Sequence, residues 1–262
     1  MTIGKRFIYV CAGFLLATIS LITVAAEPSL YIYSTIDALL AGAYDGDLTV
    51  KELSTKGNFG LGTYNHLDGE MVIHAGVIYH VRSDGSVSVA DPSDRVPLAY
   101  VVPFQPTETF SVESASTLPT IEALADQHIS NKNMFYAIEI KGSLTTISTR
   151  AIAAQSKPYR PLAEVSKTQA VFNRDSVSGT LVGIRSPSLS KGISVPGYHW
   201  HFISDDKKYG GHVLSAELAK GVAKLALVRR LEIELPATEA FASADQDKDR
   251  GAELRTVEGA KH

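Results

Sequence analysis

The chain has 262 residues, of which 45% are hydrophobic and 20% charged, and its formal net charge is −3. This composition suits one large domain or two closely packed lobes and excludes a disordered protein. No basic run offers a surface for phosphate backbones, so we expect no nucleic-acid partner.

Residues 1–26 have the pattern of a secretory signal peptide. Lys5 and Arg6 precede an apolar run that ends near Val24, and small residues follow it. A membrane anchor is the alternative, because the run is nearly long enough to span a bilayer. The small residues favour cleavage, so we expect an exported protein, periplasmic or extracellular, with no membrane attachment after cleavage. Cys11 is the only cysteine, so the mature chain would have no disulfide.

Helical patterns stand near the front and in the middle of the chain. Ser34 and Asp37 in "STIDALLAGAYDG" have a spacing like that of a capping box, and Thr49 and Glu52 in "TVKELSTKG" have it as well. Each segment therefore predicts a short helix. A third helix is expected in "TLPTIEALADQHIS".

Alternating apolar residues indicate strands over most of the remaining chain. "MVIHAGVIYHV" and "SVSVA" flank "RSDG", and "MFYAIEI" and "SLTTIST" flank "KG", which predicts two hairpins. Further strands are expected in "GTLVGIRSP", "YHWHFIS", "GHVLSAEL", "AKLALV" and "RLEIELP". The predicted fold class is mixed α/β (α+β), with mixed or antiparallel sheets and a few short helices. The segment "SKPYRPLAEV" is the candidate link between an N-terminal β-rich lobe, 27–160, and a C-terminal one, 161–262.

Three of the eight histidines lie in "VPGYHWHFISDDKKYGGHVL". His199 and His201 would project to the same face of a strand, because side chains alternate. His212 follows a polar turn and can return on the neighbouring antiparallel strand. Three neutral imidazoles would leave a bound Zn²⁺ with its full charge and an open coordination position, as in catalytic sites. Another divalent metal stays possible, since imidazole suits several ions.

Simpler interpretations of these histidines compete with a metal site. A single histidine often packs or satisfies a backbone group. A cupin-like site would need a nearby glutamate, and the next acidic residues are Asp205 and Asp206. His74 shares strand parity with Glu70 and could approach the same site. The spacing of all three histidines together favours the metal.

Four blocks stand out between about residue 30 and residue 258: "LGTYNHLDGEMVIHAGVIYHV", "PYRPLAEVSKTQAVF", "SGTLVGIRSP" and "GISVPGYHWHFISDDKKYGGHVL". In this order they resemble the α-acetolactate decarboxylase family. The resemblance implies two β-rich lobes with the metal between them and, by analogy, a homodimer. It places the zinc ligands on the histidine trio, and further site residues on Glu70 of "LDGE", Arg150 on the strand after the Lys-Gly hairpin, and Glu258. Trp200 departs from the family, which more often has an aliphatic residue there, and its side chain should face away from the metal.

The activity implied by the resemblance is conversion of (S)-2-acetolactate to acetoin and CO₂, a step of acetoin biosynthesis and the butanediol pathway. Zinc would chelate the hydroxyl and ketone oxygens and stabilise the enediolate formed when CO₂ leaves. Arg150 would hold the carboxylate, although a surface side chain on an edge strand is the alternative.

The proton that the enediolate needs would come from Glu70 or Glu258, and both could instead orient the ligands. Glu258 lies in a polar tail, which must fold back over the site if this residue acts. Thr63 would either touch the substrate or only finish a turn.

Two other functions are compatible with the histidines alone. One is a metal-dependent hydrolase in which the same site activates water, with Glu70 as general base. The other is a non-enzymatic periplasmic metal- or ligand-binding protein, for which Arg150 and both glutamates would be dispensable.

Overall fold

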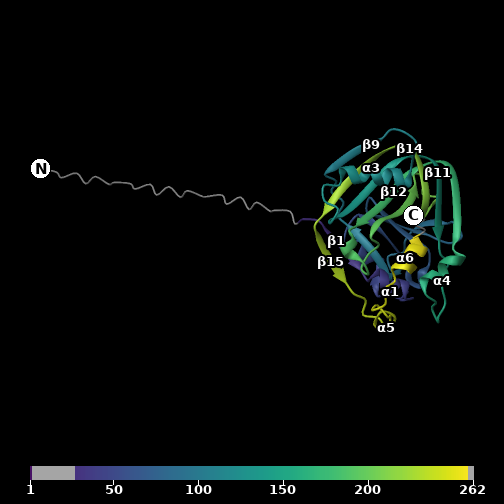
Figure 1. The fold of residues 1–262 in the computed structure, drawn as a ribbon. Coiled ribbons are helices and arrows are strands. Elements are labelled where there is room, and N and C mark those ends of the chain that lie inside the picture. Colours follow the sequence, from purple (N-terminus) through teal and green to yellow (C-terminus); the bar gives the residue numbers. More distant parts are fainter. Residues whose placement is uncertain (2–26, 259–262) are drawn as a thin grey trace.

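Two large sheets make up most of the fold in the computed structural model, which describes Met1 and residues 27–258 (Figure 1). The predicted signal peptide falls almost entirely outside the described residues. The strand order of the first, seven-stranded sheet is β15-β1-β8-β3-β4-β5-β6, with only the β1–β15 pair parallel. Its strands are β1 (Ser29–Tyr33), β3 (Phe59–Thr63), β4 (Glu70–His74), β5 (Val77–Val81), β6 (Val87–Val89), β8 (Leu98–Val102) and β15 (Arg230–Glu234).

The second sheet is antiparallel and contains the longest strands of the molecule. Its main order is β10-β14-β11-β12-β13, with β9 also paired to β14 and β13 closing onto β14 at one end. The strands are β9 (Glu108–Val112), β10 (Ser116–Thr117), β11 (Phe135–Ala151), β12 (Ala170–Ser186), β13 (Gly197–Ser204) and β14 (Gly210–Val228). A separate small pair joins β2 (Leu48–Thr49) to β7 (Arg95–Val96).

Short helices surround the sheets, so the fold is mixed α+β and strand-rich, as predicted. They are α1 (Ile36–Leu40), α2 (Val50–Leu53), α3 (Leu118–His128), α4 (Leu162–Val165), α5 (Glu239–Ala242) and α6 (Gly251–Glu258). Over the described part of the chain, no helix is both long enough and apolar enough to cross a membrane.

The three predicted helices are present, but one of them has a different cap. Thr49 and Glu52 form the expected capping box at α2. At α1 the expected cap Ser34 has a left-handed φ of 70°, and the next residue, Thr35, accepts a hydrogen bond from the Ala38 N–H at 3.2 Å. The proposed Ser34–Asp37 box is therefore wrong by one residue, because a cap must be extended for its hydroxyl to reach the helix N–H groups.

Of the two predicted hairpins, that around "RSDG" is confirmed by the β5–β6 pair. The second is wrong, because β11 runs unbroken from Phe135 to Ala151. Gly142 lies opposite Gly179 on β12 and Gly221 on β14, and a Cβ at Gly142 would lie 2.3 Å from the Lys220 carbonyl oxygen. Glycine is needed there for close approach of neighbouring strands and not for a turn.

The two sheets share a hydrophobic core, to which both contribute buried residues, including Leu30, Phe59, Ala137, Val182 and Ala226. Membership of the sheets does not follow chain order. β15 completes the first sheet, and β9 to β11 belong to the second, so a boundary at residue 160 does not separate the sheets. The division into two lobes at that point stays a prediction.

Candidate active site

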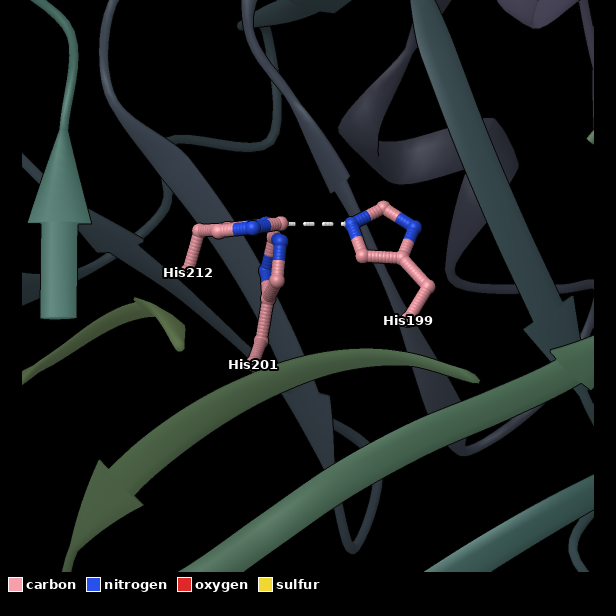
Figure 2. A group of neighbouring side chains, drawn as sticks. All are labelled: His199, His201 and His212. Carbon is pink, nitrogen blue, oxygen red and sulfur yellow. Dashed lines mark hydrogen bonds between the residues drawn. The ribbon is translucent and has the colours of Figure 1, made fainter. Parts of the chain in front are cut away.

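The histidine trio lies on the adjacent strands β13 and β14. His201 is directly opposite His212 in the antiparallel register, and His199 lies two residues earlier on the same face of β13. All three side chains are buried and their rings converge (Figure 2). His199 Nε2 is 3.2 Å from His212 Nδ1, and one nitrogen from each ring lies within 4.8 Å of the others. The predicted return of His212 on the neighbouring strand is confirmed.

The electrostatics of the trio suit a cation. Burial lowers the pKa of each imidazole, that of His199 to about 3, so the rings are neutral near pH 7. The Nδ1–H of His201 donates to the Met71 carbonyl at 2.7 Å, and its Nε2 lone pair then faces the other rings. Three neutral nitrogen donors directed at one point fit a divalent metal ion.

Glu70 reaches the trio from the first sheet, as the first residue of β4. Its Oε2 is 3.5 Å from His201 Nε2, and its Oε1 is 4.0 Å from Arg150 Nε. Burial raises the pKa of Glu70 to about 8, with Arg150 opposing this shift and Glu258 adding to it. The site therefore lies between the two sheets.

Thr63 stands beside Glu70 in the β3–β4 register. Its hydroxyl donates to the Gly69 carbonyl at 2.7 Å, which ties β3 to the turn just before Glu70. The same turn contains His66 and Leu67 with left-handed φ angles of 64° and 60°. Such backbone is costly for these residue types, so the tie by Thr63 helps to hold Glu70 in place.

Glu258 is the last residue of α6. This helix lies near the C-terminus of the described chain (Figure 1). Its Oε2 is 3.8 Å from Nε2 of both His199 and His212. Leu254 and Val257 are buried and belong to the core between the sheets. Burial raises the pKa of Glu258 to about 7, against the opposing charge of Arg150.

Arg150 lies near the end of β11, opposite His212 in the register of β11 and β14. It is on the same continuous strand as residues 135–141, so the expected position after a Lys-Gly turn is corrected. Its Nη1 donates to the Val257 carbonyl at 2.7 Å and to Gln169 Oε1 at 3.0 Å. Its buried Nε has no hydrogen-bond partner among the described residues.

Every predicted site residue lines the same cavity. Its polar lining consists of Thr63, Glu70, Arg150, His199, His201, His212 and Glu258. Its other walls are Ile36, Leu39, Gly62, Leu67, Leu98, Ile152, Leu162 and Val257. A small anionic ligand would meet one guanidinium and two carboxyl groups there, with apolar side chains that limit water.

Two further expectations concern residues outside this cavity. His74 does not approach the site, because its Nε2 lies 3.0 Å from Glu139 Oε2. Trp200 faces away as expected, with its Nε1–H donating to Glu122 Oε1 at 2.9 Å. Its ring covers Gly183, where a Cβ would lie 2.2 Å from Trp200 Cζ3.

Two contributions to the site were not predicted from the sequence. The Met71 carbonyl orients His201, and the Gln169 amide holds Arg150. Met71 directly follows Glu70 and could have been found as part of the same strand. Nothing in the local pattern around Gln169 points to Arg150, because they meet only through the pairing of β11 with the start of β12.

Comparisons of the sequence and of the structure with known proteins point to the same family. A family model described as alpha-acetolactate decarboxylase matches residues 30–248. Alpha-acetolactate decarboxylases from Methanosarcina mazei and Klebsiella aerogenes are 41% and 39% identical to this chain, each over 89% of it and over 81% and 91% of their own length. The crystal structure of alpha-acetolactate decarboxylase from Bacillus subtilis strain 168 aligns with a TM-score of 0.87 at 36% identity, covering 88% of this chain and 100% of that one.

Proposed function

Because the chain belongs to the alpha-acetolactate decarboxylase family and is a carboxy-lyase, we propose that it converts (S)-2-acetolactate to acetoin and CO₂ in a zinc-dependent reaction. The observation that carries this proposal is the convergence of three neutral imidazoles, one guanidinium and two carboxyl groups on one buried cavity. This membership argues against both the hydrolase and the non-enzymatic binding protein. Acetoin formation would place the enzyme in acetoin and butanediol metabolism.

The metal would be held by His199, His201 and His212. When bound, a divalent cation supplies positive charge to the hydroxyl and ketone oxygens of the substrate and stabilises the negative charge that develops as CO₂ leaves. The chain itself keeps the three rings neutral by burial and fixes the His201 tautomer through the Met71 carbonyl.

Arg150 would bind the substrate carboxylate and orient the bond that breaks. Its Nη1 is already used by Val257 and Gln169, which leaves the buried Nε facing Glu70 as an available donor. A fixed guanidinium loses little freedom on binding an anion, so it can position the carboxylate at low entropic cost.

Glu70 and Glu258 are the two groups able to donate a proton on the way to acetoin. Burial raises both pKa values, to about 8 and about 7 in the protein alone, which favours a protonated acid near neutral pH. The charge of a cation held by the trio would oppose this shift. They reach the trio from different elements, β4 and α6, and lie beside different rings, Glu70 beside His201 and Glu258 beside His199 and His212. Delivery of the proton from a fixed direction would give one enantiomer of acetoin.

A metal-removal experiment tests this function. Treatment with a chelator should abolish formation of acetoin and CO₂ from (S)-2-acetolactate, and Zn²⁺ should restore both. His212→Ala should lower the metal content measured by elemental analysis, whereas His128→Ala, a change in a histidine that pairs with Glu108 away from the site, should leave it unchanged. Full activity after complete metal removal would refute the proposal.

Export is a separate part of the proposal and rests on residues 1–26 alone. Mass spectrometry of protein secreted by the producing cell should find Glu27 as the first residue. An intact N-terminus on the secreted or membrane-bound protein would favour the anchor interpretation.

A further inference from the structure

The face of β13 that points away from the histidine trio packs against α3. Tyr198 and Trp200 alternate with two histidines of the trio along the strand, so their side chains point to the opposite face. Trp200 is buried in a second hydrophobic cluster, together with Ile121 and Ala125 of α3. Figure 1 shows α3 beside the long strands of this sheet. The strand that carries the proposed metal ligands therefore lies between the cavity and a helix.

Two acidic side chains of α3 bind Tyr198 and Trp200, which we call the aromatic pair. Trp200 Nε1–H donates to Glu122 Oε1 at 2.9 Å, and the Tyr198 hydroxyl donates to Asp126 Oδ1 at 2.7 Å. Residues four apart on a helix are separated by about 6 Å along its axis, and residues two apart on a strand by about 6.6 Å. Because the two spacings match, one face of α3 holds both members of the aromatic pair at once.

His199 lies in the part of β13 that has the fewest other supports. β12 pairs with β13 over residues 197–204, whereas β14 pairs with it only at residues 201–203. Among the described strands, His199 therefore has a neighbour on one side alone. His201 has strands on both sides, and its ring is also fixed by the Met71 carbonyl. The direction of the His199 ring thus depends more strongly on what holds the aromatic pair.

The indole of Trp200 also packs closely on the neighbouring strand. Gly183 of β12 is its register partner, and a Cβ at Gly183 would lie 2.2 Å from Trp200 Cζ3. The absence of a side chain there lets the ring lie over the backbone of β12 while its N–H reaches Glu122. Trp200 is therefore held from two sides, by β12 and by α3.

We propose that Trp200, held by Glu122, is a positioning residue that fixes His199 for metal binding. This inference rests on the proposed metal site. A side chain that fixes the backbone beside a ligand limits how far the ligand ring can turn away from the ion. Contacts that orient metal ligands commonly change metal affinity by about 10- to 100-fold. Loss of the bond between Trp200 and Glu122 should therefore make the protein release its metal faster.

The rate of zinc release tests this role without any measurement of activity. The full chain, loaded with Zn²⁺, is mixed with an excess of a chromogenic chelator, and the absorbance of the zinc–chelator complex follows the release. Glu122→Leu removes the acceptor and leaves Trp200 in place, so it should release zinc about tenfold faster than the unsubstituted protein. Trp200→Phe removes the donor and should have the same effect. Glu122→Gln keeps an acceptor oxygen and should restore slow release.

Ile121→Val is the matched control for a general loss of stability. It removes one methylene group from the same helix and the same cluster but keeps both hydrogen bonds to the aromatic pair. It should lower the urea midpoint of unfolding and leave the release rate unchanged, while circular dichroism checks that each variant is folded.

The outcomes separate this inference from the proposed function. Release from zinc-loaded Glu122→Leu at the unsubstituted rate would overturn the role of Trp200 and leave the metal site standing. Equally fast release from Ile121→Val and Glu122→Leu would also overturn it, because the effect would then be one of stability. An unsubstituted protein that binds no zinc would overturn the proposed metal site and this inference with it.

Discussion

At the scale of single residues, Arg150 is the group whose placement decides how the cavity receives an anion. Its guanidinium is fixed by the carbonyl of Val257 and the amide of Gln169, and both contacts use the same nitrogen, Nη1. Glu70 lies 4.0 Å from Nε. A planar group held on one side can present its remaining N–H donors to a carboxylate in a fixed orientation.

Substitution of Arg150 by lysine should therefore impair catalysis although the positive charge is kept. We expect kcat/KM for acetolactate to fall about a hundredfold, because an ammonium group cannot reproduce the guanidinium geometry. Steady-state kinetics measure this effect, and elemental analysis should find unchanged metal content. Arg185→Lys is the control, since Arg185 is another buried arginine with an unpartnered Nε but donates to the carbonyls of Lys132 and Met134, outside the cavity. Equal losses in the two variants would point to a general structural effect.

At the scale of elements, the short amphipathic helix α6 forms one wall of the site. It packs Leu254 and Val257 into the core and thereby directs Glu258 at His199 and His212. Glu253, on the same helix, instead contacts Lys248 and Arg250 near the surface. The two glutamates of one helix thus have separable roles.

Substitution of Glu258 should lower the activity, whereas substitution of Glu253 should not. Glu258→Gln removes a proton donor while keeping the shape of the side chain, so kcat should fall about a hundredfold. Glu253→Gln removes only partly exposed ion pairs and should leave kcat within about twofold. Acetoin formation at saturating acetolactate measures both. An active Glu258→Gln variant would limit this residue to a role in packing.

Two strand segments, the β13–β14 hairpin and β11, differ in how far the local sequence predicts their structure. The hairpin of β13 and β14 was predictable, because a polar turn separates two alternating runs and fixes the faces of His199, His201 and His212. The sequence around Lys141 and Gly142 has the same pattern of two alternating runs around a turn-like pair, yet β11 continues through it without a turn. Its glycine is explained by β12 and β14 on either side, and a local pattern holds no information about such neighbours.

The site was predictable to different degrees for similar reasons. The trio follows from spacing alone, since its members lie within fourteen consecutive residues, 199–212. Glu70, Arg150 and Glu258 come from β4, β11 and α6, and only the family resemblance linked them before the fold was known. The supporting contacts of Met71 and Gln169 depend on how the sheets are placed.

At the scale of the whole molecule, the position of the site between the sheets makes their mutual attachment important. β4 carries Glu70 at one end and His74 at the other, and His74 Nε2 lies 3.0 Å from Glu139 Oε2 on β11. β11 carries Arg150 towards its far end. The contact between His74 and Glu139 therefore joins the two strands that bring Glu70 and Arg150 together, and Lys224 on β14 adds a second bond to Glu139 at 3.2 Å.

This junction predicts a pH dependence of stability. The hydrogen bonds from His74 and then Lys224 lower the pKa of Glu139 against the effect of burial. A carboxyl group with a depressed pKa in the folded state stabilises the fold above its unfolded pKa, and this contribution disappears as the pH falls through the folded value. Glu139→Gln should therefore reduce the free energy of unfolding by about 1 kcal/mol at pH 7, because the substitution removes these charged hydrogen bonds.

Urea denaturation of the unsubstituted protein and of the variant measures this difference in unfolding free energy. The difference should shrink below about pH 4, because glutamate is then protonated in the unfolded chain and increasingly in the folded one. A difference that stays constant from pH 7 to about pH 3 would mean that Glu139 acts through its shape and not through its charge.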